Sequence, residues 1–500
     1  MTSPSSPDLR NRLAPLEMDS GEFRRLGHML VDQLADAMAG VALGKVTPDE
    51  TTSEVRLAFG LGQTLPEQGM PAADILSSLV GRLFDHSLFN AHPRFFGYIT
   101  APPAPIGVLG DLVASALNAN VGSWRLSPAA TEIEAETIRW IGELIGYPAG
   151  AAGLLVSGGN MANFVGFFAA RAARAPGVRV DGLAASPQLV LYTSAETHTW
   201  IQKAADLSGL GTAAVRWIPT DASLRMKVDA LETRIDADVR AGHVPFLVVG
   251  TAGSVSTGAV DPLPALARIC RERGLWFHVD GAYGGFAAAA PNVPDDLRGI
   301  AEADSVAIDP HKWLYAPLEA GCAIVRDPAA LRNAFAYHPP YYHFDEEVLN
   351  FVDYGPQNSR GFRALKVWLA LRQAGATGYR RMIADDIRLS QLMAAEIVGM
   401  PDMELGTQAL SIATFRYVPI DLRASVGTTT TEDYLNRLNQ ALLDRLQRGG
   451  DAFVSNAVVA GRYLLRACVV NFHATQTDVE AVPAIVAREG RLLDREIRDV

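Results

Sequence analysis

The middle of the chain alternates short, almost continuously apolar segments with segments of helical periodicity. Apolar runs bounded in this way are typical of buried strands, and helices between them favour a mainly parallel sheet covered on both faces. The expected strands are 153–157, 188–193, 214–218, 245–251, 275–280, 304–309 and 321–326, with helices at 160–174, 198–208, 226–241 and 262–273. Such sheets bind ligands beyond the carboxyl ends of their strands, so the polar residues there are the first candidates for a functional site.

The regions on either side follow different patterns. Apolar residues recur at three- and four-residue spacing over 23–38, which predicts an amphipathic helix, and a second helix is expected at 73–84. This opening part has no expected strand, so its apolar face needs the next domain or a second subunit as a partner. After a long helix near 359–375 the expected elements are strands 410–418, 452–461 and 462–471 and helices 431–447 and 477–498. We therefore expect a helical segment 1–103, a large α/β domain 104–376 and a small α+β domain 377–500.

Composition excludes several classes of protein. Apolar residues make up 49% of the 500 positions and charged residues 20%, as in an ordinary globular chain. The net charge of −11 argues against nucleic acid or an anionic membrane as the main partner. The N-terminus lacks the apolar core of a signal peptide, and no apolar run reaches the roughly 20 residues of a membrane-spanning helix. The three cysteines are far apart and favour a reducing cytoplasm over a disulfide framework.

Three strand ends carry residues that are candidates for binding or catalysis. Ser157-Gly158-Gly159-Asn160 ends one strand and opens a helix, where backbone N–H groups and the helix dipole favour an anion. Taken alone, such a turn can be purely structural. Asp280 follows a second strand and is compatible with a metal ligand, a ribose-binding acid, the partner of a protonated ring nitrogen or a simple cap. Lys312 follows a third strand beside Trp313, and desolvation there favours imine formation with an aldehyde.

The glycine turn, Asp280 and Lys312 together indicate a cofactor more specifically than any of them alone. Pyridoxal 5′-phosphate (PLP) requires a phosphate cradle, a lysine that traps its aldehyde and an acid that keeps its pyridine nitrogen protonated. The three strand ends provide these groups in chain order. A nicotinamide oxidoreductase or a P-loop protein would need the spacing GxGxxG or GxxxxGK[ST], which the glycine turn lacks.

Longer motifs then indicate a family. HVDGAYGG (278–285) and DPHKW (309–313) resemble the group II PLP-dependent amino-acid decarboxylases, which include aromatic-L-amino-acid and glutamate decarboxylases. Further matches are HPRFFGY (92–98), SWRLSPAATEIE (123–134), SGGNMAN (157–163), GTAGSVSTGAVD (250–261) and SRGFRALKVW (359–368). The resemblance implies an α/β PLP-dependent transferase of fold type I, which is aspartate aminotransferase-like, and an amino-acid substrate.

The resemblance also implies roles for individual residues. Lys312 becomes the Schiff-base lysine, Asp280 the pyridinium partner, and His198 the flat group stacked on the cofactor ring. Ala282 would pack on the opposite face of the ring, and Thr251 would contact its oxygen side. The phosphate site would be lined by Gly158, Gly159, Asn160 and His311. Many relatives have serine or threonine where this chain has Asn160, and an asparagine still donates a hydrogen bond.

The aromatic-rich segment 335–354 has no clear periodicity. Its family counterpart is a mobile active-site loop whose tyrosine protonates Cα after carbon dioxide leaves, a role that falls on Tyr341, with Tyr342 as the competing choice. Relatives that oxidatively deaminate their substrates to aldehydes tend to carry phenylalanine there. His338 and His343 have no third ligand or HExxH motif beside them, so we expect no metal site.

Substrate and assembly are less constrained. Phe96 and Tyr98 are candidates for an apolar side-chain pocket. Gly122 and Arg125 stand where aromatic-specific relatives often have a bulky and a small residue. We favour an aromatic amino acid, with an acidic one as runner-up and aldehyde-forming deamination or a non-catalytic PLP-binding protein as rival activities. The resemblance implies a homodimer, to whose active site Ser359 and Arg360 would contribute from the neighbouring subunit.

Overall fold

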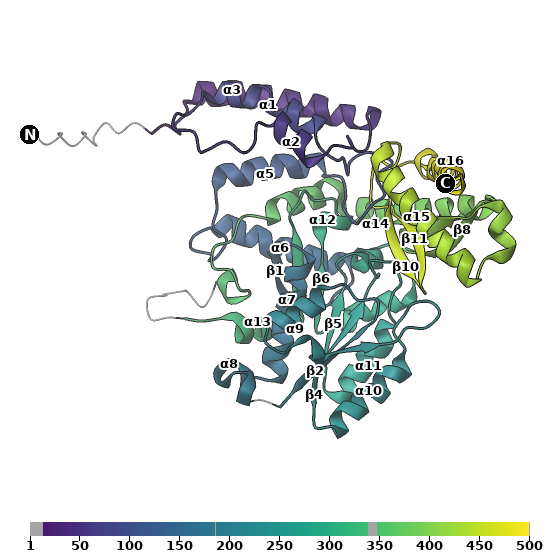
Figure 1. The fold of residues 1–500 in the computed structure, drawn as a ribbon. Helices are drawn as coiled ribbons and strands as arrows, with labels where there is room; N and C mark the ends of the chain where they lie inside the picture. Colours follow the sequence, from purple (N-terminus) through teal and green to yellow (C-terminus); the bar gives the residue numbers. More distant parts are fainter. Residues whose placement is uncertain (1–13, 186, 339–347, 500) are drawn as a thin grey trace, which may run out of the picture. The chain divides into compact units, whose positions relative to one another are not determined.

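The computed structural model describes residues 14–185, 187–338 and 348–499. The chain folds into two compact units, one formed by Met1–Phe89 with Arg448–Gly450 and the other by Asn90–Gln447 with Asp451–Val500. Each unit is described separately below, and Figure 1 gives the element labels. Within the described ranges, no helix combines the length and the apolar composition needed to cross a membrane.

The first unit is helical. Its α-helices are α1 (Ser20–Gly40), α2 (Thr52–Ala58), α3 (Ala72–Ser77) and α4 (Leu79–Asp85). Helix α1 begins where Asp19 Oδ1 accepts the backbone N–H groups of Gly21 and Glu22, at 2.7 and 2.9 Å. The second predicted helix is divided into α3 and α4 at Ser78, whose φ and ψ of −111° and −1° depart from helical geometry. Helix α1 packs on α3 and α4.

The second unit contains a seven-stranded sheet with the order β1-β7-β6-β5-β4-β2-β3. Its strands are β1 (Ala152–Val156), β2 (Leu189–Ser194), β3 (Val215–Ile218), β4 (Val244–Thr251), β5 (Trp276–Asp280), β6 (Ser305–Ile308) and β7 (Gly321–Val325). Strand β7 runs antiparallel to both neighbours, and the remaining pairings within the sheet are parallel. Six strands therefore run in one direction and bring their carboxyl ends to the same edge, as predicted.

Helices cover this sheet. They are α5 (Pro105–Leu117), α6 (Pro128–Leu144), α7 (Gly159–Arg174), α8 (Val178–Asp181), α9 (Trp200–Leu207), α10 (Val228–Arg240), α11 (Leu263–Arg273), α12 (Pro310–Trp313) and α13 (Pro328–Phe335). Helix α7 packs across β4, β5, β6 and β7, while α10 and α11 pack on β4. Every residue of β2, β5, β6 and β7 is buried, so both faces of the sheet are covered.

A smaller antiparallel sheet forms the carboxyl-terminal part of the same unit, with the order β10-β11-β9-β8. Its elements are β8 (Met403–Ala409), β9 (Ile412–Tyr417), α15 (Thr429–Gly449), β10 (Ser455–Val459), β11 (Arg462–Cys468) and α16 (Gln476–Arg498). Leucines and valines of α15 and α16 share one core with β9 and β11. The predicted α+β character of this region is confirmed, and β8 is a strand that the sequence pattern did not predict.

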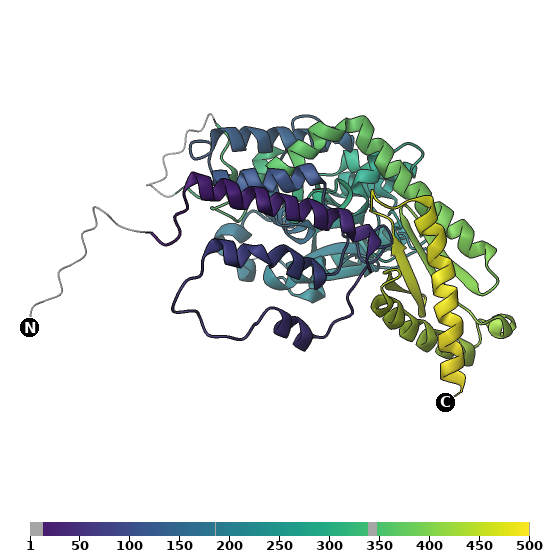
Figure 2. The ribbon, with the colours of Figure 1, turned by 90° about the horizontal axis from the view of Figure 1, so that it is seen from above.

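A single long helix, α14 (Ala364–Gly399), serves both sheets. Its first half contacts α5 and α6, and its second half lies beside α16, as Figure 2 shows. The helix is kinked at Gly375, which has φ 63° and ψ 170°, a conformation that glycine adopts without steric cost. The predicted domain boundary after residue 376 therefore falls within this helix, next to the kink.

Candidate active site

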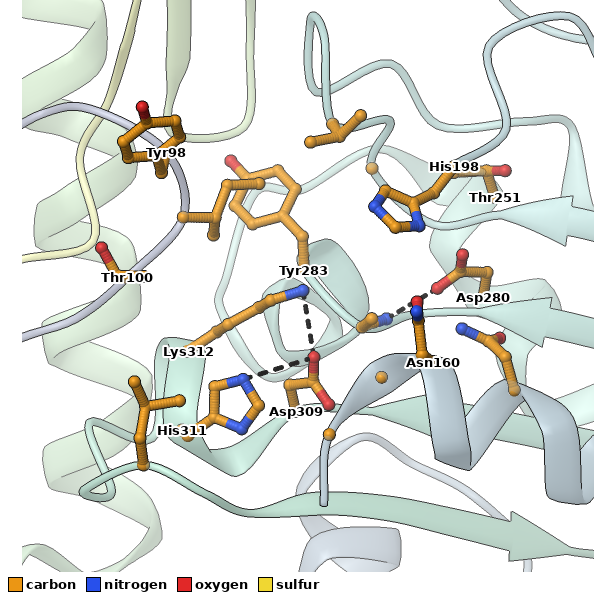
Figure 3. A pocket seen from close by; sticks show the side chains of 18 of the residues that line it. Tyr98, Thr100, Asn160, His198, Thr251, Asp280, Tyr283, Asp309, His311 and Lys312 are labelled. Carbon is orange, nitrogen blue, oxygen red and sulfur yellow. Dashed lines mark hydrogen bonds and ion pairs between the residues drawn. The ribbon is translucent and has the colours of Figure 1, made fainter. Parts of the chain in front are cut away.

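A cavity of about 630 Å³ opens at the edge of the large sheet where the parallel strands end. Its walls come from the ends of β4, β5 and β6, the turn between β1 and α7, residues 98–100, and Ser455, Asn456 and Arg466 of the smaller sheet. Figure 3 shows Lys312, Asp309, Asp280, His198, Asn160 and Tyr98 around this space. Lys312, Asp280 and Gly159, which the sequence places at strand ends, all line this cavity.

The turn between β1 and α7 forms an anion-binding concavity. Gly158 has a φ of +139°, which disfavours any residue with a side chain. A Cβ at Gly159 would lie 2.7 Å from Asp309 Oδ2 and 3.0 Å from the Cβ of Ala282, so a side chain would fill the space in front of the helix. The backbone N–H groups at the start of the 16-residue helix α7 thus stay accessible, and Asn160 adds a polar side chain.

Lys312 projects into the cavity from the short helix α12, directly after β6. Its Nζ lies 3.0 Å from Oδ2 of Asp309, a carboxylate whose side chain is 1% exposed. The second oxygen of that carboxylate, Oδ1, is buried and has no hydrogen-bond partner among the described residues. His311 Nε2 is 3.7 Å from the same Oδ2, and burial lowers the pKa of the His311 imidazole. Buried polar atoms are normally hydrogen-bonded, so a ligand that enters the cavity would be able to donate the missing hydrogen bond to Asp309 Oδ1.

Asp280 ends β5 and is held by two uncharged donors. The indole Nε1–H of Trp200 donates to Asp280 Oδ2 at 2.7 Å, and the backbone N–H of Ala282 donates to Oδ1 at 3.2 Å. His198 lies above Asp280 in Figure 3, and its Nδ1 accepts the backbone N–H of Trp200 at 3.3 Å. Burial lowers the pKa of His198, which favours the neutral imidazole near pH 7. Thr251 follows β4 and lines the same space.

The structure brings together the residues expected to hold a cofactor, but not every expected substrate residue. Phe96 is fully buried in the core of the small domain, because its backbone pairs with Phe453 and Cys468 and turns its ring away from the cavity. Its neighbour Tyr98, at φ +52°, does line the cavity and is 54% exposed. Gly122 and Arg125 are not among the cavity residues, and Arg125 is exposed elsewhere.

Arg360 forms its observed contacts within its own chain. Its guanidinium pairs with Glu134 of the same chain and donates to the carbonyls of Val121 and Leu155, at 2.9 and 2.7 Å. These contacts enclose the guanidinium in its own chain, where its side chain is only 1% exposed. Ser359 is exposed, and Tyr341 and Tyr342 lie outside the described residues.

Three residues of the site were not predicted from the sequence. Asp309 stands in the DPHKW motif itself, where its place three residues before Lys312 was the available signal. Arg466 lines the cavity from β11, is 5% exposed, and donates from Nη1 to the carbonyl of Val255. Its Nε has no partner among the described residues, and no carboxylate there forms an ion pair with it. The sequence signal for Arg466 was a charged residue inside the apolar run RYLLRACVV. No sequence signal pointed to Trp200.

The groups present fit PLP. The glycine turn suits a phosphate, Lys312 suits an aldehyde, and the buried Asp280 suits a protonated ring nitrogen. Among the described residues, no group of three or more His, Cys, Asp or Glu side chains is arranged to hold a metal ion.

Comparisons with known proteins agree with this chemistry. The family model described as the pyridoxal-dependent decarboxylase conserved domain matches residues 59–418. An aromatic-L-amino-acid decarboxylase of Bacillus atrophaeus is 33% identical over 93% of this chain and 94% of its own length. A phenylacetaldehyde synthase of Petunia hybrida is 31% identical over 90% of this chain and 91% of its own. The crystal structure of Oryza sativa TDC with PLP and tryptamine has a TM-score of 0.88 and 27% identity, covering 96% of this chain and all of the other.

Proposed function

Because the chain belongs to the pyridoxal-dependent decarboxylases, we propose that it converts an aromatic L-amino acid into the amine and carbon dioxide, with PLP held on Lys312. The enzyme is a PLP-dependent amino-acid decarboxylase, as the family match over most of the chain supports. The observation that carries the residue assignment is the meeting of Lys312, Asp280 and the glycine turn in one cavity, although they come from three separate strand ends. PLP supplies an electron sink for the pair released when a bond to Cα breaks.

The residues around the cavity divide the work of holding the cofactor. Gly158, Gly159, Asn160 and His311 would bind its phosphate, and Asp280 would accept a hydrogen bond from its ring nitrogen. Ala282 and His198 would enclose the ring from its two faces, with Thr251 at its oxygen side. Lys312 would bind the aldehyde of the cofactor, and Asp309 Oδ2, at 3.0 Å from Nζ, helps to hold the lysine side chain in the cavity.

Decarboxylation further requires that the residues around the cavity hold the bond between Cα and the substrate carboxylate in the orientation in which it breaks, so orientation would be the main task of the protein. The neutral imidazole of His198 is exposed to the cavity and suited to position the substrate carboxylate. For the proton that replaces carbon dioxide at Cα, Tyr341 is our proposed donor and Tyr342 its alternative. Both lie outside the described residues, so this assignment rests on the family resemblance.

An aromatic substrate is supported by the aromatic-L-amino-acid decarboxylase relative and by Tyr98, whose ring lies 6.0 Å from that of Phe453 at the mouth of the cavity. One observation favours a second candidate, decarboxylation of an acidic amino acid. Arg466 presents a buried guanidinium to the cavity without an ion-pair partner among the described residues, and a carboxylate is its natural complement.

The decisive experiment is a screen of the twenty amino acids and common derivatives for carbon dioxide release and for the organic product. We expect amine and carbon dioxide in equal amounts from an aromatic substrate. Aldehyde with ammonia and peroxide would instead assign the deaminating activity suggested by the phenylacetaldehyde synthase relative. Arg466→Met separates the two substrate classes. A loss of activity confined to acidic substrates would mean that the guanidinium binds the substrate side chain, whereas a loss of activity with every substrate would mean that it binds the α-carboxylate.

Lys312→Ala tests the cofactor assignment. The visible absorption band of bound PLP should disappear together with activity, because none of the other described residues that line the cavity is a lysine. Lys227→Ala is the matched control, since Lys227 is exposed and does not line the cavity. A band that survives in Lys312→Ala would refute the assignment.

We further propose that the enzyme is a cytoplasmic homodimer. The exposed apolar side chains of Leu109, Leu112, Val113 and Leu117 along α5 support a subunit interface. The three cysteines are free and buried, which suits a reducing compartment. Light scattering of the active enzyme tests the assembly, and a fully active monomer would exclude it.

A further inference from the structure

Asp280 is a buried acid whose hydrogen bonds come from uncharged donors. The residue is 6% exposed, and within the described part of the chain it forms no ion pair with lysine, arginine or histidine. Its two oxygens are held instead by N–H groups, from the Trp200 indole at 2.7 Å and the Ala282 backbone at 3.2 Å. A buried carboxylate is costly unless it is hydrogen-bonded, so these two donors satisfy its oxygens and fix its direction.

The shorter of these bonds comes from a side chain that is itself immobilised. Trp200 is completely buried at the first position of α9, and its ring meets the ring of His278 edge to face, with centroids 5.8 Å apart. His278 is fixed in turn by Asn163 and Ser305, each at 2.7 Å from one ring nitrogen. The indole N–H therefore has one available direction, and that direction leads to Asp280 Oδ2.

Trp200 does not line the cavity, so it acts on a ligand only through Asp280. We propose that Trp200 is a positioning residue for the cofactor, and that its indole N–H holds Asp280 in the orientation in which it accepts a hydrogen bond from a ring nitrogen. The inference rests on the proposed function, in which Asp280 faces the PLP nitrogen. It adds that part of the affinity for PLP resides in a residue that PLP does not touch.

Removing this donor should weaken the recognition of the ring nitrogen and leave the other cofactor contacts unchanged. The loss of a hydrogen bond to a charged group should raise the dissociation constant of PLP about ten- to hundredfold. The change is Trp200→Phe, which retains an aromatic ring. A second variant carries benzothienylalanine at position 200, which keeps the bicyclic shape and replaces the N–H by sulfur. It tests the same bond without leaving a cavity.

The control is Trp276→Phe on β5. Trp276 is 5% exposed, and its indole donates to Ser305 Oγ at 2.8 Å, so the substitution removes a comparable buried ring and hydrogen bond. Its acceptor is uncharged and neither residue lines the cavity, while Ser305 keeps its contact with His278, so the indole N–H of Trp200 and its support stay in place. Melting temperatures of the apo proteins report whether each variant is folded.

The measurement is equilibrium dialysis of apo protein against PLP and against 1-deaza-PLP, in which carbon replaces the ring nitrogen. The wild-type protein should bind PLP more tightly than the deaza compound, and both position-200 variants should lose at least about tenfold of this preference, whereas Trp276→Phe keeps it. Folded position-200 variants that retain the full preference would overturn the role of Trp200. A wild-type protein without any preference would instead refute the role of Asp280, so the two failures are distinguishable.

Discussion

Glu134 and Arg360 form an ion pair closed off from solvent, and removal of one charge tests how strongly the large domain depends on it. The side chains are 0% and 1% exposed. Glu134 Oε1 also accepts the backbone N–H of Leu155 at 2.8 Å, and Arg360 donates to two backbone carbonyls. The pair thereby joins α6, β1 and the segment before α14.

The change is Glu134→Gln, which keeps the shape of the side chain and an oxygen for Leu155. It leaves the guanidinium charge of Arg360 buried and uncompensated, and breaking a buried pair in this way costs about 3–5 kcal/mol of unfolding free energy. Glu143→Gln is the matched control on the same helix, α6. Its partner is Arg139, and both side chains are more than half exposed, so its loss should cost at most about 0.5 kcal/mol.

Urea unfolding followed by circular dichroism measures both variants. We expect a clearly lower midpoint for Glu134→Gln, little change for Glu143→Gln, and partial recovery in the double variant Glu134→Gln/Arg360→Met, which removes the orphaned charge. If Glu134→Gln unfolds at the same urea concentration as Glu143→Gln, the reasoning about the buried charge is wrong.

Three further predictions concern packing, pH and the cofactor ring. Gly166→Ala should destabilise the protein by about 1–3 kcal/mol, because its Cβ would lie 2.5 Å from His278 Cε1, whereas Gly81→Ala meets no atom within 4 Å and should not lower the melting temperature. Burial raises the pKa of Asp386 from 3.8 to about 7, so its contribution to stability is fully present below pH 3.8 and is lost as the pH rises through 7. Asp386→Asn should therefore gain melting temperature relative to wild type between pH 5.5 and pH 8.5, and a constant difference would contradict the assignment. His198→Phe should retain PLP absorbance while kcat falls at least about tenfold, and an unchanged kcat would remove His198 from the mechanism.

The sequence predicts the large sheet well because its strands are buried on both faces and read as continuous apolar runs. Strand β8 has no such signal: it contains Glu404, Gly406 and Gln408, and most of its residues are only half buried. Its place is decided by pairing with β9, which is a tertiary interaction. Helix α14 is longer than predicted because the kink at Gly375 interrupts the periodicity without ending the helix.

The candidate site follows the same rule. Lys312, Asp280 and Gly159 were predictable because parallel strands bring their carboxyl ends together whatever the loops do. Trp200 and Arg466 reach the site through contacts between distant segments, and no local pattern encodes those contacts. Phe96 is the reverse case, a residue that was predicted to line the pocket and does not. Its proximity in sequence to Tyr98 had suggested a shared pocket. The pairing of residues 95 and 96 with Phe453 sends the two side chains into different surroundings.

The cavity is lined by residues that precede and residues that follow the kinked helix α14 in the chain. This arrangement has an evolutionary consequence. The groups proposed to hold the cofactor all belong to the large domain, whereas Arg466 enters the same cavity from the small domain. If Arg466 recognises an acidic side chain, as in the second candidate function, reactivity and this side-chain preference are encoded in separate stretches of the gene. Selection could change the substrate by altering the small-domain wall alone, and a chimaera that exchanges residues after Gly375 would carry a new preference on an old chemistry.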